Sequence, residues 1–358
     1  MRLEFDLATL YDSNVYATHD KVRDDAVVQA NARFTALYGG PSRQLRAVAH
    51  IEHAQHLAVG RETATSFGLL VGATRQARRA GPATLTAQFD RAIESRSDPE
   101  ARASSLQTPR KIDIFKADAS YAHSLGPLNL ELSAAAQSVN YLDPHEGDRD
   151  LRQYSGSVRL GWRLLGATSL FAEPFLVRRD FVRRVDLSGT NRDSSTQGLL
   201  VGVALPGSGL ISGRIGAGVF RLEPDSHTLS AFTGFAASGE VTWKPQPRTA
   251  LTLTLFSGDV ATVRAGATGR RDASATLRLE QEVRHNLLLT VAGQWEQTRY
   301  RGAANADRDT QRLDVEASYL FHRNLALFAR GMVAHRDAAM TSNRYDRQTW
   351  SIGIRYQR

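Results

Sequence analysis

The sequence predicts an all-β fold: a single closed, antiparallel transmembrane β-barrel of 18 strands that occupies residues 1–358. Three observations predict it. Hydrophobic and polar residues alternate with a period of two over stretches of ten or more residues. Tight turns recur about every 40 residues. Between them lie longer polar breaks, and alternating short turns and long loops are typical of barrels of the bacterial outer membrane.

The alternation is clearest in four stretches. Near the start, Leu3, Phe5 and Leu7 lie on one side of an extended chain, and charged residues lie on the other. The same pattern covers residues 26–38, 273–284 and 311–321. Each stretch predicts a strand about twice as long as strands of soluble proteins, with one apolar and one polar face.

The breaks between these stretches carry the Gly, Pro and Asn residues of turns. Eight tight turns and nine longer loops join 18 strands. The short breaks fall at residues 39–42, 80–82, 125–127, 165–167, 206–209, 245–247, 285–286 and 322–324. The longer breaks fall at residues 12–25, 56–61, 97–109, 143–150, 186–195, 223–233, 259–271, 302–309 and 337–346.

Composition excludes several other classes. The longest apolar stretch, residues 199–205, is far shorter than the roughly 20 residues of a membrane-spanning helix. There is no cysteine, which excludes disulfides and thiolate metal sites. A soluble propeller would repeat at a similar distance, but with four short strands in each repeat. A sandwich rarely sustains such long alternation.

The order of the breaks sets the orientation. A long loop follows the first strand, so both chain ends are expected on the short-turn, periplasmic side. The last segment alternates Trp350, Ile352, Ile354 and Tyr356 outward and resembles the C-terminal strand that barrel insertion machinery recognises. Alternation begins directly after Met1, from which we expect either a leader already removed or an upstream domain.

The net charge is +8, and only four of the 45 basic residues are lysines. Each arginine-rich stretch has acidic residues close by, which argues against a nucleic-acid partner. The arginine bias is consistent with genomic base composition or with selection for two-point contacts to carboxylate or sulfate groups.

No motif predicts catalysis. His50, His53 and His56 resemble a metal cluster, but on a strand His53 points to the opposite face from the other two, so no metal site is expected. No nucleophile motif and no phosphate-binding glycine loop occur, so we expect neither an enzyme nor a cofactor.

Strand parity instead predicts a charged inner face. Two interpretations stay open: a ladder of ion pairs that stiffens the wall, or a track of unpaired arginines for an anionic solute. Two strands fit less well. Residues 168–182 predict a bulge or inward aromatics, and Phe328 falls on a polar face. The candidate lumen-lining residues are Arg33, Arg46, Arg159, Arg163, Arg214, Arg278, Arg312, Arg330, Arg347, Glu52, Glu131, Glu280 and Glu316.

Short motifs resemble a known family. Residues 10–15 with Asp24 and Asp25, residues 191–195, the strand at 213–220, Trp243-Lys-Pro, and residues 306–309 and 343–346 are similar to the outer-membrane β-barrel porins of exopolysaccharide gene clusters. The resemblance implies an outer-membrane pore for a polysaccharide substrate that works with a periplasmic polysaccharide export protein and an inner-membrane polymerisation machine.

The remaining expected partners are outer-membrane lipid, lipopolysaccharide and, during insertion, the barrel assembly machinery. Two alternatives stay open. One is a general or solute-selective porin. The other is the C-terminal translocation barrel of a larger secretion or assembly protein.

Overall fold

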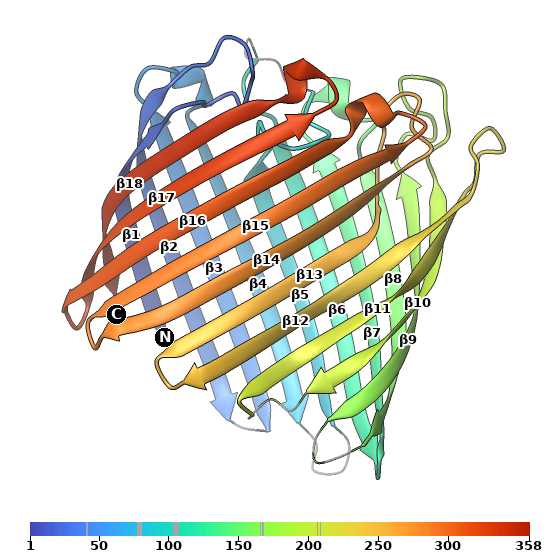
Figure 1. Cartoon of the computed structure of the whole chain (residues 1–358), viewed down its shortest axis with the longest axis horizontal. Coiled ribbons are helices and arrows are strands. Elements are labelled where there is room, and N and C mark those ends of the chain that lie inside the picture. Colours follow the sequence, from blue (N-terminus) through green and yellow to red (C-terminus); the bar gives the residue numbers. More distant parts are fainter. Residues whose placement is uncertain are drawn as a thin grey trace.

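The computed structural model is a closed barrel of 18 antiparallel strands (Figure 1). It describes residues 1–40, 42–76, 81–102, 107–164, 166, 168–205, 207 and 209–358. Each strand pairs with its neighbours in the sequence, and β1 closes the barrel against β18, from Glu4 opposite Gln357 to Asp12 opposite Thr349. Closure leaves no sheet edge, so backbone groups are paired within the wall.

The strands are 11 to 16 residues long, and the described parts of the loops contain four short 3-10 helices. Among the described residues, no helix is both long enough and apolar enough to cross a membrane. The strands are β1 (Arg2–Asp12), β2 (Asp25–Gly40), β3 (Arg43–His56), β4 (Ala64–Gln76), β5 (Pro82–Ile93), β6 (Lys111–Leu125), β7 (Leu128–Tyr141), β8 (Leu151–Arg163), β9 (Ser169–Phe181), β10 (Ser194–Leu205), β11 (Ile211–Pro224), β12 (Phe232–Gln246), β13 (Thr249–Val260), β14 (Gly269–Arg284), β15 (Leu287–Arg301), β16 (Arg308–His322), β17 (Leu325–Ala338) and β18 (Tyr345–Gln357).

The predicted fold class is confirmed. The tight turns follow the even-numbered strands, and the longer connections follow the odd-numbered ones, where the sequence predicts them. Both chain ends lie at the short-turn end (Figure 1). Parts of four predicted short turns, at residues 41, 80, 165, 167, 206 and 208, lie outside the described residues.

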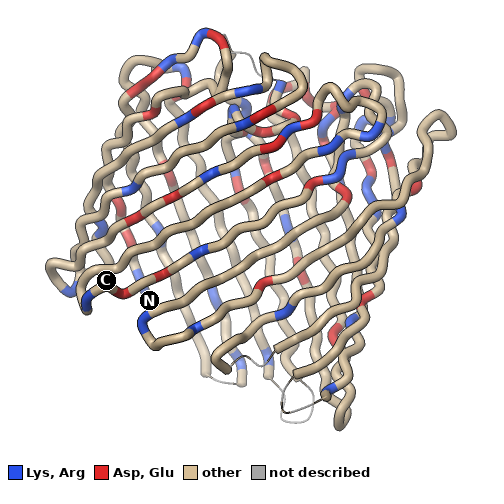
Figure 2. Tube along the Cα trace, viewed as in Figure 1, with Lys and Arg blue, Asp and Glu red and all other residues tan. Residues whose placement is uncertain are grey.

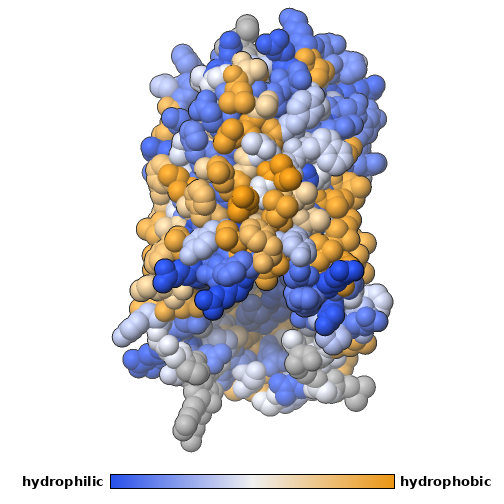
Figure 3. Space-filling view, turned by 90° about the vertical axis from the view of Figure 1, so that its left-hand side faces the viewer, coloured by the Kyte–Doolittle hydropathy of each residue, from blue (hydrophilic) through white to orange (hydrophobic). Residues whose placement is uncertain are grey.

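The outer face is hydrophobic across the middle of the barrel. Leu253 is in register with Val241 and Leu277, whereas the next residue, Thr252, bonds Thr242 on the other face. On the side shown in Figure 3, an apolar band lies between two hydrophilic ends. Such a band matches the hydrocarbon layer of a membrane. Charged residues gather at the long-loop end (Figure 2).

The two strands that fit the alternation less well carry inward aromatic rings. β9 pairs with β10 without a register shift, and Phe171 and Phe175 lie on its inner face. In β17, Phe328 is 2% exposed and covers Gly353 of β18. A side chain at that glycine would collide with the ring, so glycine and phenylalanine on neighbouring strands interlock.

Candidate functional site

A cavity of about 790 Å³ lies inside the barrel, bordered by strands β5 to β13. Its two sides differ. On β9 to β12 the inner face carries a cluster of apolar side chains, which we call the aromatic wall: Phe171, Phe175, Leu200, Phe220, Leu222, Phe232 and Ala236. Phe220 is 1% exposed and meets Phe232 edge to face, with ring centroids 5.8 Å apart. Glycines on the adjoining strands leave room for these rings.

The opposite side, on β5 to β8, carries small polar side chains, and we call it the hydroxyl wall: Thr84, Thr86, Ser120, Ser133, Gln137, Gln153, Ser155 and Ser157. Ser133 and Ser157 share a hydrogen bond of 2.7 Å, and Ser157 donates to Glu173. Hydroxyl and amide groups both donate and accept, so this wall can exchange hydrogen bonds with water or with a hydrated solute.

Ionic groups lie toward both ends of the cavity. Toward the short turns, Arg159 contacts Glu131 and Glu173, and Arg214 lies 3.5 Å from Glu131. Toward the long loops, Arg179 of β9 pairs with Asp259 of β13, which also accepts from Thr196. The pairs Arg214–Glu131 and Arg179–Asp259 join strands that are not neighbours, so they run through the interior.

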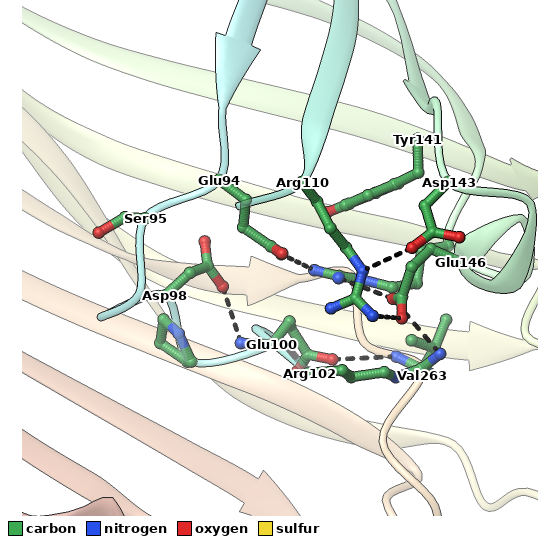
Figure 4. A network of polar contacts seen from close by, with 12 residues as sticks. Glu94, Ser95, Asp98, Glu100, Arg102, Arg110, Tyr141, Asp143, Glu146 and Val263 are labelled. Atoms are coloured by element: carbon green, nitrogen blue, oxygen red, sulfur yellow. Dashed lines mark hydrogen bonds and ion pairs between the residues drawn. The ribbon is translucent and has the colours of Figure 1, made fainter. Parts of the chain in front are cut away.

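The loop of residues 94–110, between β5 and β6, begins and ends in a buried ionic cluster (Figure 4). Glu94 accepts from Arg149 at 2.6 Å, and Arg149 also contacts Glu146. Arg110 reaches the same Glu146 at 2.9 Å, while Arg102 holds Asp148 through both its terminal nitrogens. These charge-assisted bonds fix the loop to the connection between β7 and β8.

The middle of the loop reaches the far side of the barrel. Arg264 donates to the carbonyl of Pro99 and Arg336 to that of Ser97, while Glu100 accepts from Tyr300 at 2.8 Å. β6 and β15 are nine strands apart in either direction around the ring. Residues 94–102 of the loop therefore reach across the interior and narrow the passage at the long-loop end.

Burial raises the pKa of Glu94, and the bond from Arg149 only partly offsets this because it favours the charged carboxylate. Glu94 therefore takes up a proton at a higher pH than an ordinary glutamate. The Arg110 charge also favours ionisation, and the Asp98 charge opposes it. As the pH falls, the negative charge of Glu94 at the root of the loop is therefore lost before that of an ordinary glutamate.

The structure gives the sequence-predicted residues different surroundings. Arg159, Arg214 and Glu131 meet beside the cavity. Arg163 contacts Asn129, Glu52 borders a smaller cavity near Arg96, and Arg33 and Arg46 have no ion pair within the described part of the chain. The other pairs are Arg278–Glu280, Arg312–Asp314, Arg330–Glu316 and Arg347–Asp12.

The three histidines do not converge. His50 faces Asp90 at 3.6 Å, His56 bonds Asp25 at 3.0 Å, and His53 bonds Thr65. Within the described ranges, no group of three or more His, Asp or Glu side chains is arranged to hold a metal ion.

Sequence reasoning offered inward aromatic side chains as one alternative for residues 168–182, but it found neither the aromatic wall as a whole nor the reach of Glu100. The wall had a signal in the sequence, since each ring falls on the inward parity of its strand, and Phe175 and Phe220 face Gly198 and Gly234 on the next strand. The contacts of Glu100 had no signal in the sequence, because its partners Thr262 and Tyr300 lie more than 160 residues away from it in the chain.

Comparison with known proteins agrees with the fold. Residues 2–358 match a family described as putative beta-barrel porin 2. No curated protein sequence matches the chain.

Solved outer-membrane barrels have similar folds at low sequence identity. OccK2 (OpdF) of Pseudomonas aeruginosa has 13% identity and a TM-score of 0.50, and the match covers 99% of this chain and 97% of that one. OpdL of the same organism has 13% identity and a TM-score of 0.47, covering 100% and 98%. The FrpB iron transporter of Neisseria meningitidis has 9% identity and a TM-score of 0.49, covering 100% and 81%.

Proposed function

Because the chain belongs to the putative beta-barrel porin 2 family, a porin-like barrel of the bacterial outer membrane, we propose that it conducts an exopolysaccharide chain out of the cell. The cavity between the aromatic wall and the hydroxyl wall carries the proposal. A pyranose ring has apolar C–H faces and hydroxyl groups around its edge. The aromatic wall can contact the apolar faces of the ring, and the hydroxyl wall can exchange hydrogen bonds with its hydroxyl groups.

The chemistry of the walls suits passage better than tight binding. Serine, threonine and glutamine exchange hydrogen bonds with sugar hydroxyls and with water at little net cost, because each bond gained replaces another. Aromatic rings add contact with the sugar faces. Since no ATP is available at the outer membrane, a chain has to slide through a wall that does not hold it firmly.

The resemblance seen in the sequence supplies the partners of this proposal. A periplasmic polysaccharide export protein would deliver the chain to the short-turn end, where both termini lie. The chain would then pass the cavity and leave beside the loop of residues 94–110. Lipid and lipopolysaccharide would surround the apolar outer band.

A passive porin for small solutes is the second candidate. One observation favours it: the loop between β5 and β6 is bound to Arg149 on one side of the barrel and to Tyr300 of β15 on the other, and it narrows the passage. A narrow passage would admit a single extended sugar chain or a small solute, but not a folded polymer.

A matched pair of substitutions tests the proposal in a strain that lacks the gene. Ser155→Trp places a bulky ring in the cavity, whereas Tyr154→Trp changes an exposed residue of β8 that does not border the cavity. Complementation with the wild type or Tyr154→Trp should restore surface polysaccharide, and Ser155→Trp should restore much less. Normal surface polysaccharide in the deletion strain would contradict export and favour the small-solute porin.

A further inference from the structure

Two arginines donate to the middle of the loop of residues 94–110 at the long-loop end of the barrel, and a third lies beside them. Arg264 donates to Pro99 at 2.9 Å and Arg336 donates to Ser97 at 2.7 Å. Arg308 lies beside them and is close enough to interact electrostatically with both. We call Arg264, Arg308 and Arg336 the arginine cluster.

The arginine cluster differs from most arginines of the inner wall. Arg159, Arg179, Arg312, Arg330 and Arg355 each pair with a carboxylate. Across the described ranges, no carboxylate forms an ion pair with Arg264, Arg308 or Arg336. Like charges placed together without an ion-paired carboxylate repel one another, so the cluster favours an added anion.

Burial strengthens this preference. Arg308 and Arg336 are 7% and 6% exposed. The Nε atoms of Arg264 and Arg308 are buried and have no hydrogen-bond partner. A buried guanidinium without an acceptor is costly, since it has lost water and gained nothing in return. Two unused N–H donors on adjacent cations are the groups that bind a carboxylate.

The loop already brings one carboxylate next to the cluster. Glu100 accepts from Thr262 at 2.9 Å and from Tyr300 at 2.8 Å, and it lies 3.6 Å from Arg270. Arg264 and Arg270 also lie over the Tyr300 ring. The site therefore already holds one carboxylate. The single negative charge of Glu100 balances only part of the positive charge of the surrounding arginines.

We propose that the arginine cluster binds the carboxylate of an acidic saccharide, such as a uronic acid unit, and that Glu100 is the internal competitor for that position. The inference rests on the proposed function and names its substrate class. An arriving carboxylate takes the free Nε donors of Arg264 and Arg308, and Arg264 is also the residue that holds the loop through the carbonyl of Pro99. Binding of the saccharide carboxylate is thereby coupled to the contacts that hold the loop across the passage.

Titration calorimetry on the purified full-length barrel in detergent tests the site with sodium glucuronate as the probe. Glucose is the neutral comparison, and sodium sulfate is the comparison for an inorganic anion. The wild type should bind glucuronate and not glucose. Arg308→Gln should weaken glucuronate binding about tenfold, the loss expected for one charge-assisted hydrogen bond. Arg308 pairs with no carboxylate, so this variant should fold.

Two further variants sharpen the test. Glu100→Gln removes the competing charge and should tighten glucuronate binding by about threefold or more. Arg221→Gln is the matched control, because Arg221 is an exposed arginine near the same end that pairs with Glu223 outside the cluster. This variant should bind like the wild type.

Three results would overturn the site: equal binding of glucose and glucuronate, binding of sulfate without glucuronate, or unchanged glucuronate binding by Arg308→Gln. These failures are distinct from a failure of the proposed function. A deletion strain with normal surface polysaccharide would refute export while leaving the carboxylate site intact, and loss of the site would leave neutral-polysaccharide export possible.

Discussion

The inner faces of β9–β12 and of β14–β18 use the same alternating backbone for opposite purposes. On β9–β12, phenylalanines lie over glycines of nearby strands and form a closely packed, apolar wall. On β14–β18, arginines and acids pair along and across strands, as in the network of Arg355 with Asp6 and Glu316. The first region gains stability from packing. The second remains hydrated, and its charges add little stability but set the field of the passage.

The largest expected loss of stability comes from a substitution in the aromatic wall. Phe220→Ala removes a ring that is 1% exposed, and such truncations cost about 3–5 kcal/mol. Arg312→Ala removes one partner of an ion pair that is about half exposed, which should cost roughly 1 kcal/mol or less. Urea unfolding in lipid vesicles measures both. Equal losses would show that the two regions do not differ as described.

The next largest loss of stability is expected from a charge placed on the outer face. Leu253→Arg places a charge on the lipid side near mid-membrane and should cost about 2–4 kcal/mol in the same assay. Thr252→Arg places the charge on the inner face beside Thr242 and should cost much less. Similar costs at the two positions would mean that the assignment of faces in β13 is wrong.

A smaller effect tests the interlocking of rings and glycines. A Cβ at Gly234 would collide with the ring of Phe220, so Gly234→Ala should cost about 1–3 kcal/mol. Gly293→Ala is the control, because nothing lies within 4 Å of its Cβ position and it should change stability little. If both substitutions have the same effect, close packing does not hold the rings in place.

The excess of basic over acidic residues in the whole chain should make the pore weakly selective for anions. Neutralising Arg33, Arg46, Arg159 and Arg214 together should lower that selectivity, and added salt should lower it in the wild type by screening. Reversal potentials in planar bilayers report both. Cation preference in the wild type would contradict an acidic cargo.

The smallest effect is a dependence on pH. The raised pKa of Glu94 means that its charge is lost as the pH falls through a range above that of ordinary glutamates. Loss of a negative charge beside Arg149 and Arg110 should raise anion selectivity on mild acidification. Glu94→Gln should already show the higher selectivity at neutral pH and should respond less to acid. An unaltered pH profile in this variant would exclude Glu94 as the titrating group.

The sequence predicts the strands and the outer face of the barrel but little of the arrangement of side chains inside it. Strand count, turns and outer face follow from local alternation, because every second residue faces lipid. Phe175 and Phe328 break that alternation, and in the sequence they resemble irregularities. Their role emerges only when Gly198 and Gly353 are placed one strand away. The bonds of Glu100 to Thr262 and Tyr300 join distant segments and follow no periodicity.

The central claim is that the tethered loop of residues 94–110, and not the wall, sets the width of the passage. Single-channel conductance in planar bilayers tests it on a variant whose residues 97–107 are replaced by a short Gly-Ser linker. The replacement removes Asp98, Glu100 and Arg102 and so changes the net charge by only one unit. The account predicts a clearly larger conductance than that of the wild type. The same conductance in both would contradict it.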